Sequence, residues 1–282
     1  MNRQPGKAQL EKAERLRALH AGPGAFVIPN PWDRGSALLL EGMGFRALAT
    51  TSAGAAFAMG RRDGAMGREA MTAHICEIAE VTELPVSVDL ENGFGDAPRD
   101  VAEAIRMAAE AGACGGSIED ATGWDAMPMY LLEESAERVR AAVEAARSLK
   151  FPFAVTARCE NFLHGRPDLK DTIARLQAYQ EAGADVLYAP GLTTREEIGA
   201  VVSSVDRPVN VLVGLPGMTL TLREAEELGV RRLSVGSGLA RAAFGAVWSA
   251  SERMMREGTF DFGDAIGGLS DLCKLFPQID AR

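Results

Sequence analysis

The 282-residue sequence has little of what many functional classes require. It has only three histidines and four cysteines, and the cysteines stand far apart without any CxxC spacing, at Cys76, Cys114, Cys159 and Cys273. A disulfide framework or a zinc site is therefore not expected, and a reducing compartment is favoured. No apolar run is long enough to cross a bilayer, and the amino-terminal segment lacks the apolar core of a signal peptide. We expect a soluble, cytoplasmic protein without membrane partners.

Positive charge is also scarce. Thirty Lys and Arg residues face 39 Asp and Glu residues, which gives a formal net charge of −9. General nucleic-acid binding is therefore not expected, although a local basic pocket for an anionic metabolite remains open. By contrast, 47% of the residues are hydrophobic and 30 are glycine. These numbers favour a sizeable core and many tight turns between strands and helices.

Short apolar runs alternate with helix-like stretches along the whole chain. The strands are predicted at Ala25–Ile28, Ala47–Thr50, Pro85–Asp89, Gly115–Glu119, Phe153–Arg158, Asp185–Tyr188, Val209–Val213 and Arg232–Val235. The helices are predicted at Lys7–His20, Gly35–Met43, Arg68–Thr82, Arg99–Ala111, Leu132–Leu149, Asp168–Ala182, Thr194–Ser203 and Leu222–Leu228. About eight βα units of this length predict an α/β TIM barrel, with a doubly wound sheet as the alternative.

The chain shows no linker or low-complexity tract, so we expect one barrel domain over residues 1–282. A helical extension is predicted from about residue 237 to 282. Its first part, Ser237 to about Gly258, is expected to form one long helix, and a shorter helix is expected near Asp264–Leu275. This extra helical part could cap the barrel or pack on a neighbouring subunit.

Acidic residues stand at the ends of two predicted strands. Asp89 and Glu91 follow the apolar run Val86–Val88, and Glu119 and Asp120 end a second run. In a barrel, catalytic groups lie at the carboxyl ends of strands, where these side chains would meet. Oxygen ligands with few histidines suit a hard cation such as Mg²⁺ or Mn²⁺, of which Mg²⁺ keeps several waters. The structural alternative is that these acids cap helices or pair with Arg and Lys.

A cation ends the fifth predicted strand. Arg158 offers a permanently charged, planar fork that could bind a substrate carboxylate or an enolate oxygen. The structural alternative is an internal ion pair with Glu119 or Glu160. Its neighbour Cys159 points to the opposite side of the strand and is expected to be a packed thiol. Tyr188 ends the sixth strand and is expected to line the pocket.

The connections after the first two strands hold further candidates. Thr51, Ser52 and Ala53 form a small-residue turn whose N–H and hydroxyl groups could hold a carboxylate, and Asp63 lies in the same connection. Asp33 is expected to cap the next helix. The run Gly236-Ser237-Gly238 after the eighth strand is a rival phosphate site, although no P-loop lysine accompanies it. Of the histidines, His164 lies in a loop near the site, and His20 and His74 are expected at the surface.

With these residues in hand, the chain resembles the isocitrate lyase/phosphoenolpyruvate mutase superfamily. The resemblance spans about Phe26 to Gly258, and its carriers are FVIPNPWDRGSALLLEGMGFRALATTSAGAAFAMGRRDG, VDLENGFGD, GGSIEDATG, TARCENFLHG, GADVLYAPGL and VGLPGMTLTLREAEELGVRRLSVGSG. It implies a barrel whose last helix is exchanged between subunits of a homotetramer, a dimer of dimers.

The resemblance also implies roles for particular residues. Mg²⁺ or Mn²⁺ would lie near Asp89, Glu91 and Glu119, with Glu91 standing where relatives often have Asp. Thr51, Ser52 and Ala53 match the loop that holds the substrate carboxylate, and Arg158 matches the substrate-binding arginine. Asp63 matches an acid near the metal. We therefore expect Arg158, Asp63 and Glu119 as catalytic residues, and Thr51, Ser52, Ala53, Arg158 and Tyr188 as substrate-binding residues.

Departures from the family motifs argue against some of the activities known in the family. Isocitrate and methylisocitrate lyases carry a Lys-Lys-Cys-Gly-His motif where this chain reads EDATGWDAMP, which argues against those two activities. Phosphonopyruvate enzymes carry Lys and Asn on that loop, and the mutase histidine is replaced by Ala189. The hypothesis is a metal-dependent lyase that cleaves a C–C bond or decarboxylates a small 2-oxo or 2-hydroxy carboxylic acid. The alternatives are a phosphonopyruvate-type hydrolase or mutase and a non-catalytic metabolite-binding barrel.

Overall fold

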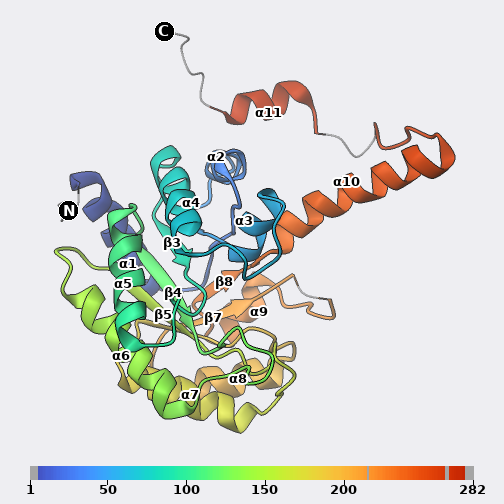
Figure 1. Ribbon diagram of the computed structural model, residues 1–282. Helices are drawn as coiled ribbons and strands as arrows, with labels where there is room; N and C mark the ends of the chain where they lie inside the picture. The colour runs from blue at the N-terminus through green and yellow to red at the C-terminus, as the bar shows by residue number, and fades with distance from the viewer. Residues whose placement is uncertain (1–5, 215, 264–266, 277–282) are drawn as a thin grey trace.

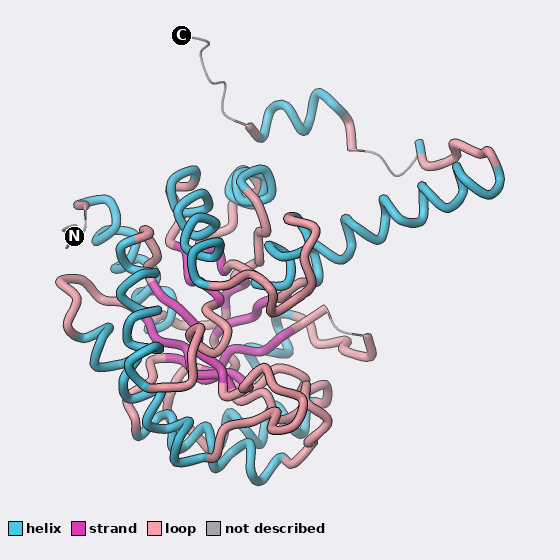
Figure 2. The backbone as a smooth tube through the Cα atoms, viewed as in Figure 1, coloured by secondary structure: helices cyan, strands magenta, loops and turns pink. Residues whose placement is uncertain are grey.

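Eight parallel strands form one curled sheet at the centre of the protein (Figures 1 and 2). The computed structural model describes residues 6–214, 216–263 and 267–276. Its strands are β1 (Phe26–Val27), β2 (Leu48–Ala49), β3 (Val86–Asp89), β4 (Gly115–Glu119), β5 (Ala154–Arg158), β6 (Val186–Tyr188), β7 (Val209–Leu212) and β8 (Arg232–Ser234). Every predicted strand is thereby confirmed, with no boundary shifted by more than one residue.

Helices α2 to α9 lie outside the sheet and connect successive strands, whereas α1 precedes β1 and α10 and α11 follow β8. They are α1 (Lys7–Ala21), α2 (Arg34–Gly42), α3 (Ser52–Ala58), α4 (Arg68–Val81), α5 (Pro98–Glu110), α6 (Leu132–Arg147), α7 (Leu169–Glu181), α8 (Arg195–Ser203), α9 (Leu222–Glu227), α10 (Gly238–Glu257) and α11 (Leu269–Leu275). The prediction of an N-cap at Asp33 is confirmed, because its Oδ1 accepts a hydrogen bond from the Ser36 amide at 2.7 Å. No helix in the described ranges is both long and apolar enough to cross a membrane.

The strand order is β1-β8-β7-β6-β5-β4-β3-β2, so β1 and β2 are the two edges of the ladder. The edges meet through single contacts. The Ala49 amide donates to the Pro29 carbonyl at 3.0 Å, and the Asn30 side-chain amide donates to the Thr50 carbonyl at 2.9 Å. The sheet is therefore TIM-like but incompletely closed, and the doubly wound alternative is excluded.

Helix α1 covers the amino-terminal end of the sheet. Its Gln9 side chain donates to the carbonyls of Ala109 and Ala113 at 2.7 and 3.0 Å, and Leu16 is fully buried. His20, on the same helix, is buried against Phe26, and His74 of α4 is buried as well. The prediction that these two histidines lie at the surface is therefore wrong. Both are placed on the inner faces of their helices, where the surrounding apolar side chains exclude water.

The carboxyl-terminal helices leave the barrel. Helix α10 projects away from it, and α11 lies near α2, where Leu275 approaches Gly42 (Figure 1). The long helix predicted from Ser237 is confirmed, and the later helix is confirmed from Leu269, with residues 264–266 outside the described ranges. Phe244, Val247, Trp248 and Met255 of α10 are exposed in the single chain. This apolar surface has the composition of an interface rather than of a solvated helix.

Candidate active site

The carboxyl ends of the strands bring the predicted polar residues into one layer. Glu119 pairs in register with Arg158, and Arg158 pairs with Tyr188. Arg158 and Tyr188 line a cavity of about 170 Å³. Of the predicted site residues, seven line this cavity: Thr51, Ser52, Ala53, Asp63, Asp89, Arg158 and Tyr188. Glu91 and Glu119 do not line it directly but connect to it through Asp89 and Arg158.

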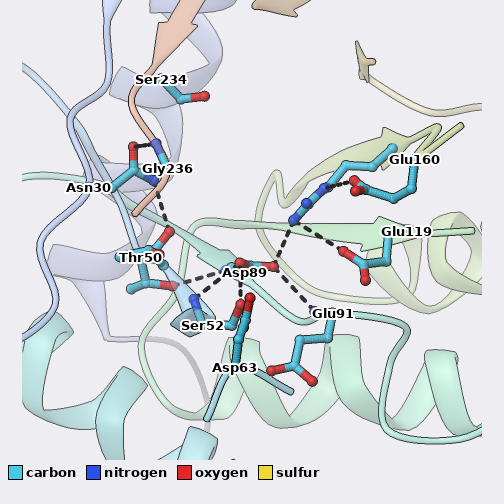
Figure 3. A network of polar contacts seen from close by, with 12 residues as sticks. Asn30, Thr50, Ser52, Asp63, Asp89, Glu91, Glu119, Glu160, Ser234 and Gly236 are labelled. Carbon is cyan, nitrogen blue, oxygen red and sulfur yellow. Dashed lines mark hydrogen bonds and ion pairs between the residues drawn. The ribbon is translucent and has the colours of Figure 1, made fainter. Parts of the chain in front are cut away.

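Asp89 lies at the centre of the polar network (Figure 3). Its Oδ2 accepts hydrogen bonds from the amide of Ser52 at 3.1 Å and from the Ser52 hydroxyl at 2.8 Å. Its own backbone amide donates a hydrogen bond to the Thr50 hydroxyl oxygen at 2.9 Å. The connection after β2 therefore fixes both the backbone and the carboxylate of Asp89, so that the carboxylate is held in place before any ligand arrives.

Arg158 forms ion pairs with three acidic residues. Its Nη1 lies 3.0 Å from Asp89 Oδ1 and 3.3 Å from Glu119 Oε2, and its Nε donates to Glu160 Oε1 at 2.8 Å. The guanidinium also lies 5.3 Å from the centre of the Tyr188 ring. The structural alternative of an internal ion pair is thus present, with both Glu119 and Glu160. Because Arg158 also lines the cavity, the ion pairs do not remove it from reach of a ligand.

The acids outnumber the single guanidinium among them. Burial and the nearby Asp89 carboxylate raise the pKa of Glu91 to about 7. Burial also raises the pKa of Glu119 well above its usual range, although Arg158 opposes this shift. Asp63 lies on the exposed connection before α4, and partial burial together with Asp89 raises its pKa too. This cluster carries a surplus of negative charge that a cation would stabilise.

This acidic cluster suits a hard cation that keeps most of its waters, rather than one coordinated directly by several protein groups. Within the described ranges, no three carboxylate, imidazole or thiol groups are close enough to coordinate one ion directly. However, Glu91 Oε1 is buried without a hydrogen-bond partner in the described part of the chain, on a residue whose φ is +51°. A non-glycine residue in this conformation is strained, and such strain is concentrated at functional sites. One direct carboxylate and water-bridged neighbours suit Mg²⁺, which keeps several waters.

The Thr51–Ala53 turn is packed tightly against its surroundings. The Thr51 hydroxyl accepts a hydrogen bond from the Gly54 amide at 3.2 Å. A Cβ at Gly54 would lie 2.6 Å from a Thr51 methyl and 2.9 Å from Trp32, so only glycine fits there. The turn therefore has little freedom, and its position next to Asp89 is fixed by packing.

Three residues close in sequence to the site residues do not line the cavity. Asp120 is buried on the other side of its strand, where it accepts hydrogen bonds from Arg175 at 3.0 Å and from Tyr179 at 2.6 Å. Cys159 is fully buried, which confirms it as a packed thiol, and burial raises its pKa. His164 is exposed in the loop after β5 and does not line the cavity. Strand alternation accounts for the first two placements.

Several further polar residues of the cavity wall had no predicted role, among them Asn30, Arg232 and Ser234. Asn30 Oδ1 accepts the amides of Val235 and Gly236, each at 2.9 Å, and so ties the first connection to the last one (Figure 3). Arg232 and Ser234 alternate with the apolar Leu233 along β8. That alternation was the available signal, because an arginine facing a barrel interior must meet a polar environment.

Comparison with known proteins agrees with this geometry. The family model described as "Phosphoenolpyruvate phosphomutase" matches residues 16–255. A provisionally named lyase/mutase of Burkholderia cenocepacia J2315, known from its crystal structure, is 58% identical, with a TM-score of 0.94 over 98% of this chain and 99% of that chain. An oxaloacetate decarboxylase of Bradyrhizobium diazoefficiens is 30% identical over 73% of this chain and 72% of its own length.

Two structures with defined activities share the fold. A 2,3-dimethylmalate lyase, described as a member of the PEP mutase/isocitrate lyase superfamily, is 26% identical with a TM-score of 0.80, over 95% of this chain and 94% of that chain. A phosphonopyruvate hydrolase in complex with oxalate and Mg²⁺ is also 26% identical with a TM-score of 0.80, over 94% of each chain. On these matches, and with its acids and arginine at the strand ends, the chain belongs to the phosphoenolpyruvate mutase/isocitrate lyase superfamily.

Proposed function

We propose that the protein is a Mg²⁺-dependent lyase that acts on a small 2-oxo or 2-hydroxy carboxylic acid through a pyruvate-type enolate. The observation that carries the proposal is the Arg158 guanidinium held against Asp89 and Glu119 at the wall of a small cavity. The lyase and decarboxylase among the relatives support C–C cleavage or decarboxylation. The cavity volume of about 170 Å³ suits a compact acid.

Different residues of the site would hold the metal, its waters and the substrate. Asp89 would hold the metal directly, and Glu91 and Glu119 would hold its waters. The Thr51–Ala53 turn would bind the substrate carboxylate. When bound, Mg²⁺ supplies a Lewis acid for the carboxylate and 2-oxo oxygens. Arg158 would donate to the oxygen on which negative charge develops, a contact that strengthens as the enolate forms.

The proton that completes the reaction needs a donor. Of the candidates Tyr188, Glu160, His164 and Cys159, only Tyr188 lines the cavity within the described residues. Burial raises the pKa of Tyr188 to about 12, with Arg158 opposing the shift, so its hydroxyl stays protonated at neutral pH. Asp63 would orient water or the metal shell from the neighbouring connection. We therefore place Tyr188 first as proton donor.

The test is a turnover assay with Mg²⁺ on oxaloacetate, methylated malates and phosphonopyruvate. The wild-type protein should convert at least one carboxylic acid of the panel, and Asp89→Ala should abolish this turnover while the fold persists by circular dichroism. Glu133→Gln, a change at an exposed acid on α6, is the matched control and should keep full activity. Full activity of Asp89→Ala would refute the site.

A second candidate is P–C cleavage in a phosphonopyruvate-type substrate. It is supported by the family description and by the phosphonopyruvate hydrolase among the similar structures. It needs cations for the phosphonate, which Arg61, Arg62 or Arg166 could supply from exposed loops. Turnover of phosphonopyruvate alone would favour it, whereas oxalate binding without turnover of any compound would indicate a non-catalytic metabolite-binding barrel.

We also propose that the chain is one barrel domain with an extension from about residue 237, and that α10 is exchanged between the subunits of a homotetramer. The exposed apolar side chains of α10, among them Val247 and Trp248, support this assembly, because a lone chain would leave them in water. The projection of α10 away from its own barrel supports an exchange rather than a simple cap (Figure 2).

A further inference from the structure

Arg232 is a buried cation that pairs with no carboxylate among the residues that the structure describes. Only 3% of its surface is exposed. Its Nε donates to the Asn210 side-chain oxygen at 2.8 Å, and its Nη1 is buried with no hydrogen-bond partner in the described part of the chain. No carboxylate of the described residues forms an ion pair with it, whereas Arg158 and Arg175 each have at least two such pairs.

Such an arrangement is costly unless something else compensates the charge. Burying an ionised side chain without a counter-ion is strongly unfavourable, because the charge loses its hydration and gains no opposite charge. Burial lowers the pKa of Arg232 to about 10, so the group is still charged at neutral pH. The ionisable groups that affect it are Tyr188, which is neutral, and Arg158, which is a like charge and cannot compensate it. His20 also senses the charge but stays uncharged, because burial and Arg232 lower its pKa to about 3.

The guanidinium reaches the same cavity as the proposed catalytic residues. Arg232 and Ser234 line it from β8, and Asp89 lines it from β3. Two hydrogen bonds of the Asn210 side chain orient this wall. Asn210 accepts one from Arg232 and donates the other to the Ser234 hydroxyl at 2.9 Å. The cavity is thus lined both by Asp89, which has further acids beside it, and by a guanidinium that pairs with no carboxylate of the described residues.

We propose that Arg232, positioned by Asn210, binds a second carboxylate of the substrate, so that the cavity selects diacids over monoacids. The inference rests on the proposed function, in which the Thr51–Ala53 turn and the metal hold the first carboxylate. The guanidinium fork suits a carboxylate and would gain the partner that Nη1 lacks. The cavity of about 170 Å³ has room for a compact diacid and excludes long side groups.

The test compares two ligands that differ only at the distal group, malate and 2-hydroxybutyrate, with oxalate as a probe of the metal end. Binding to the full-length protein with Mg²⁺ is measured by calorimetry. Wild type should bind malate at least about tenfold more tightly than 2-hydroxybutyrate, the size expected for one charge-assisted hydrogen bond. Arg232→Gln should remove this preference and leave oxalate binding unchanged.

A second variant guards against misfolding of Arg232→Gln. Asn210→Asp keeps the guanidinium but gives it an internal carboxylate partner, so it should fold at least as stably and should also lose the preference for malate. A malate preference that persists in either folded variant, or none in wild type, would overturn the role of Arg232 and leave the guanidinium solvated by internal water. Failure of oxalate to bind wild type with Mg²⁺ would instead contradict the proposed function itself.

Discussion

Arg158 Nη1 lies 3.0 Å from Asp89 Oδ1, so the proposed metal ligand and the proposed enolate-binding group already share a hydrogen-bonded ion pair in the single chain. Asp89 keeps its other oxygen for Ser52, whose amide and hydroxyl both donate to it. The carboxylate is thus oriented from two sides. A charged residue held by this many contacts is pre-organised, and pre-organised charges act on a developing negative charge without rearrangement.

Arg158→Ala should reduce kcat by about 10²- to 10³-fold, the usual cost of removing one donor that acts in the transition state. Arg158→Lys should recover little, because an ammonium cannot bridge Asp89, Glu119 and Glu160 with a planar fork. Steady-state kinetics on the substrate found in the panel measures both variants. Arg223→Ala, at a side chain of α9 that is 86% exposed, is the matched control and should be unaffected.

Mg²⁺ should stabilise the folded protein, because it offsets the surplus of carboxylates around Asp89 and Glu91. At a concentration of about 100 times Kd, the gain in unfolding free energy should be about 2.7 kcal/mol. Thermal unfolding with and without Mg²⁺, after treatment with a chelator, gives the shift. Asp89→Asn should remove most of it. An equal shift in wild type and Asp89→Asn would show that the ion binds elsewhere.

Local sequence patterns were enough to predict the strands and several residues of the site. Short apolar runs ending in Asp89, Glu119 and Arg158 predict strands, and parallel strands necessarily place their carboxyl ends together. The N-cap at Asp33 and the packed thiol of Cys159 also follow from local rules, namely capping preference and strand alternation.

What the sequence did not reveal depends on contacts between distant segments. In the sequence, Arg232 is one more charged residue in a strand. Only the assembled barrel shows that it is buried and that no carboxylate of the described ranges pairs with it. The closing contact between Pro29 and Ala49 joins the segment just after β1 to β2, two strands that share no ladder. The histidines show the same limit, since the helical faces on which His20 and His74 lie are decided by packing of α1 and α4 against the barrel.

His20 should make the protein less stable in mild acid. Burial and the nearby Arg232 lower its pKa to about 3, from 6.5 when exposed. Below pH 6.5 the unfolded state therefore binds a proton that the folded state refuses, and stability falls as the pH falls. Between pH 7.5 and 5.0 this single group should cost about 2 kcal/mol of unfolding free energy.

Urea unfolding at the two pH values, in the presence of a chelator, measures that cost. His20→Gln should remove it, because glutamine can still donate to the Leu16 carbonyl, which lies 3.0 Å from His20 Nδ1, but does not titrate. His164→Gln, at an exposed histidine, is the control and should retain the wild-type pH dependence. The same acid sensitivity in His20→Gln and wild type would mean that His20 is protonated in the folded state.

Trp248→Glu should break the proposed assembly. Trp248 is 70% exposed on α10 and lies next to Val247, so in an exchanged-helix tetramer it would be buried against a second subunit. A carboxylate placed there would be desolvated without a partner, at a cost of several kcal/mol per site. Light scattering coupled to size exclusion should show wild type as a tetramer and the variant as a smaller species. The matched control is Trp124→Glu, the same change at a tryptophan that is 57% exposed in the loop after β4 and outside α10; it should stay tetrameric. If both variants keep the wild-type mass, α10 does not form the interface, and its apolar side chains need another partner.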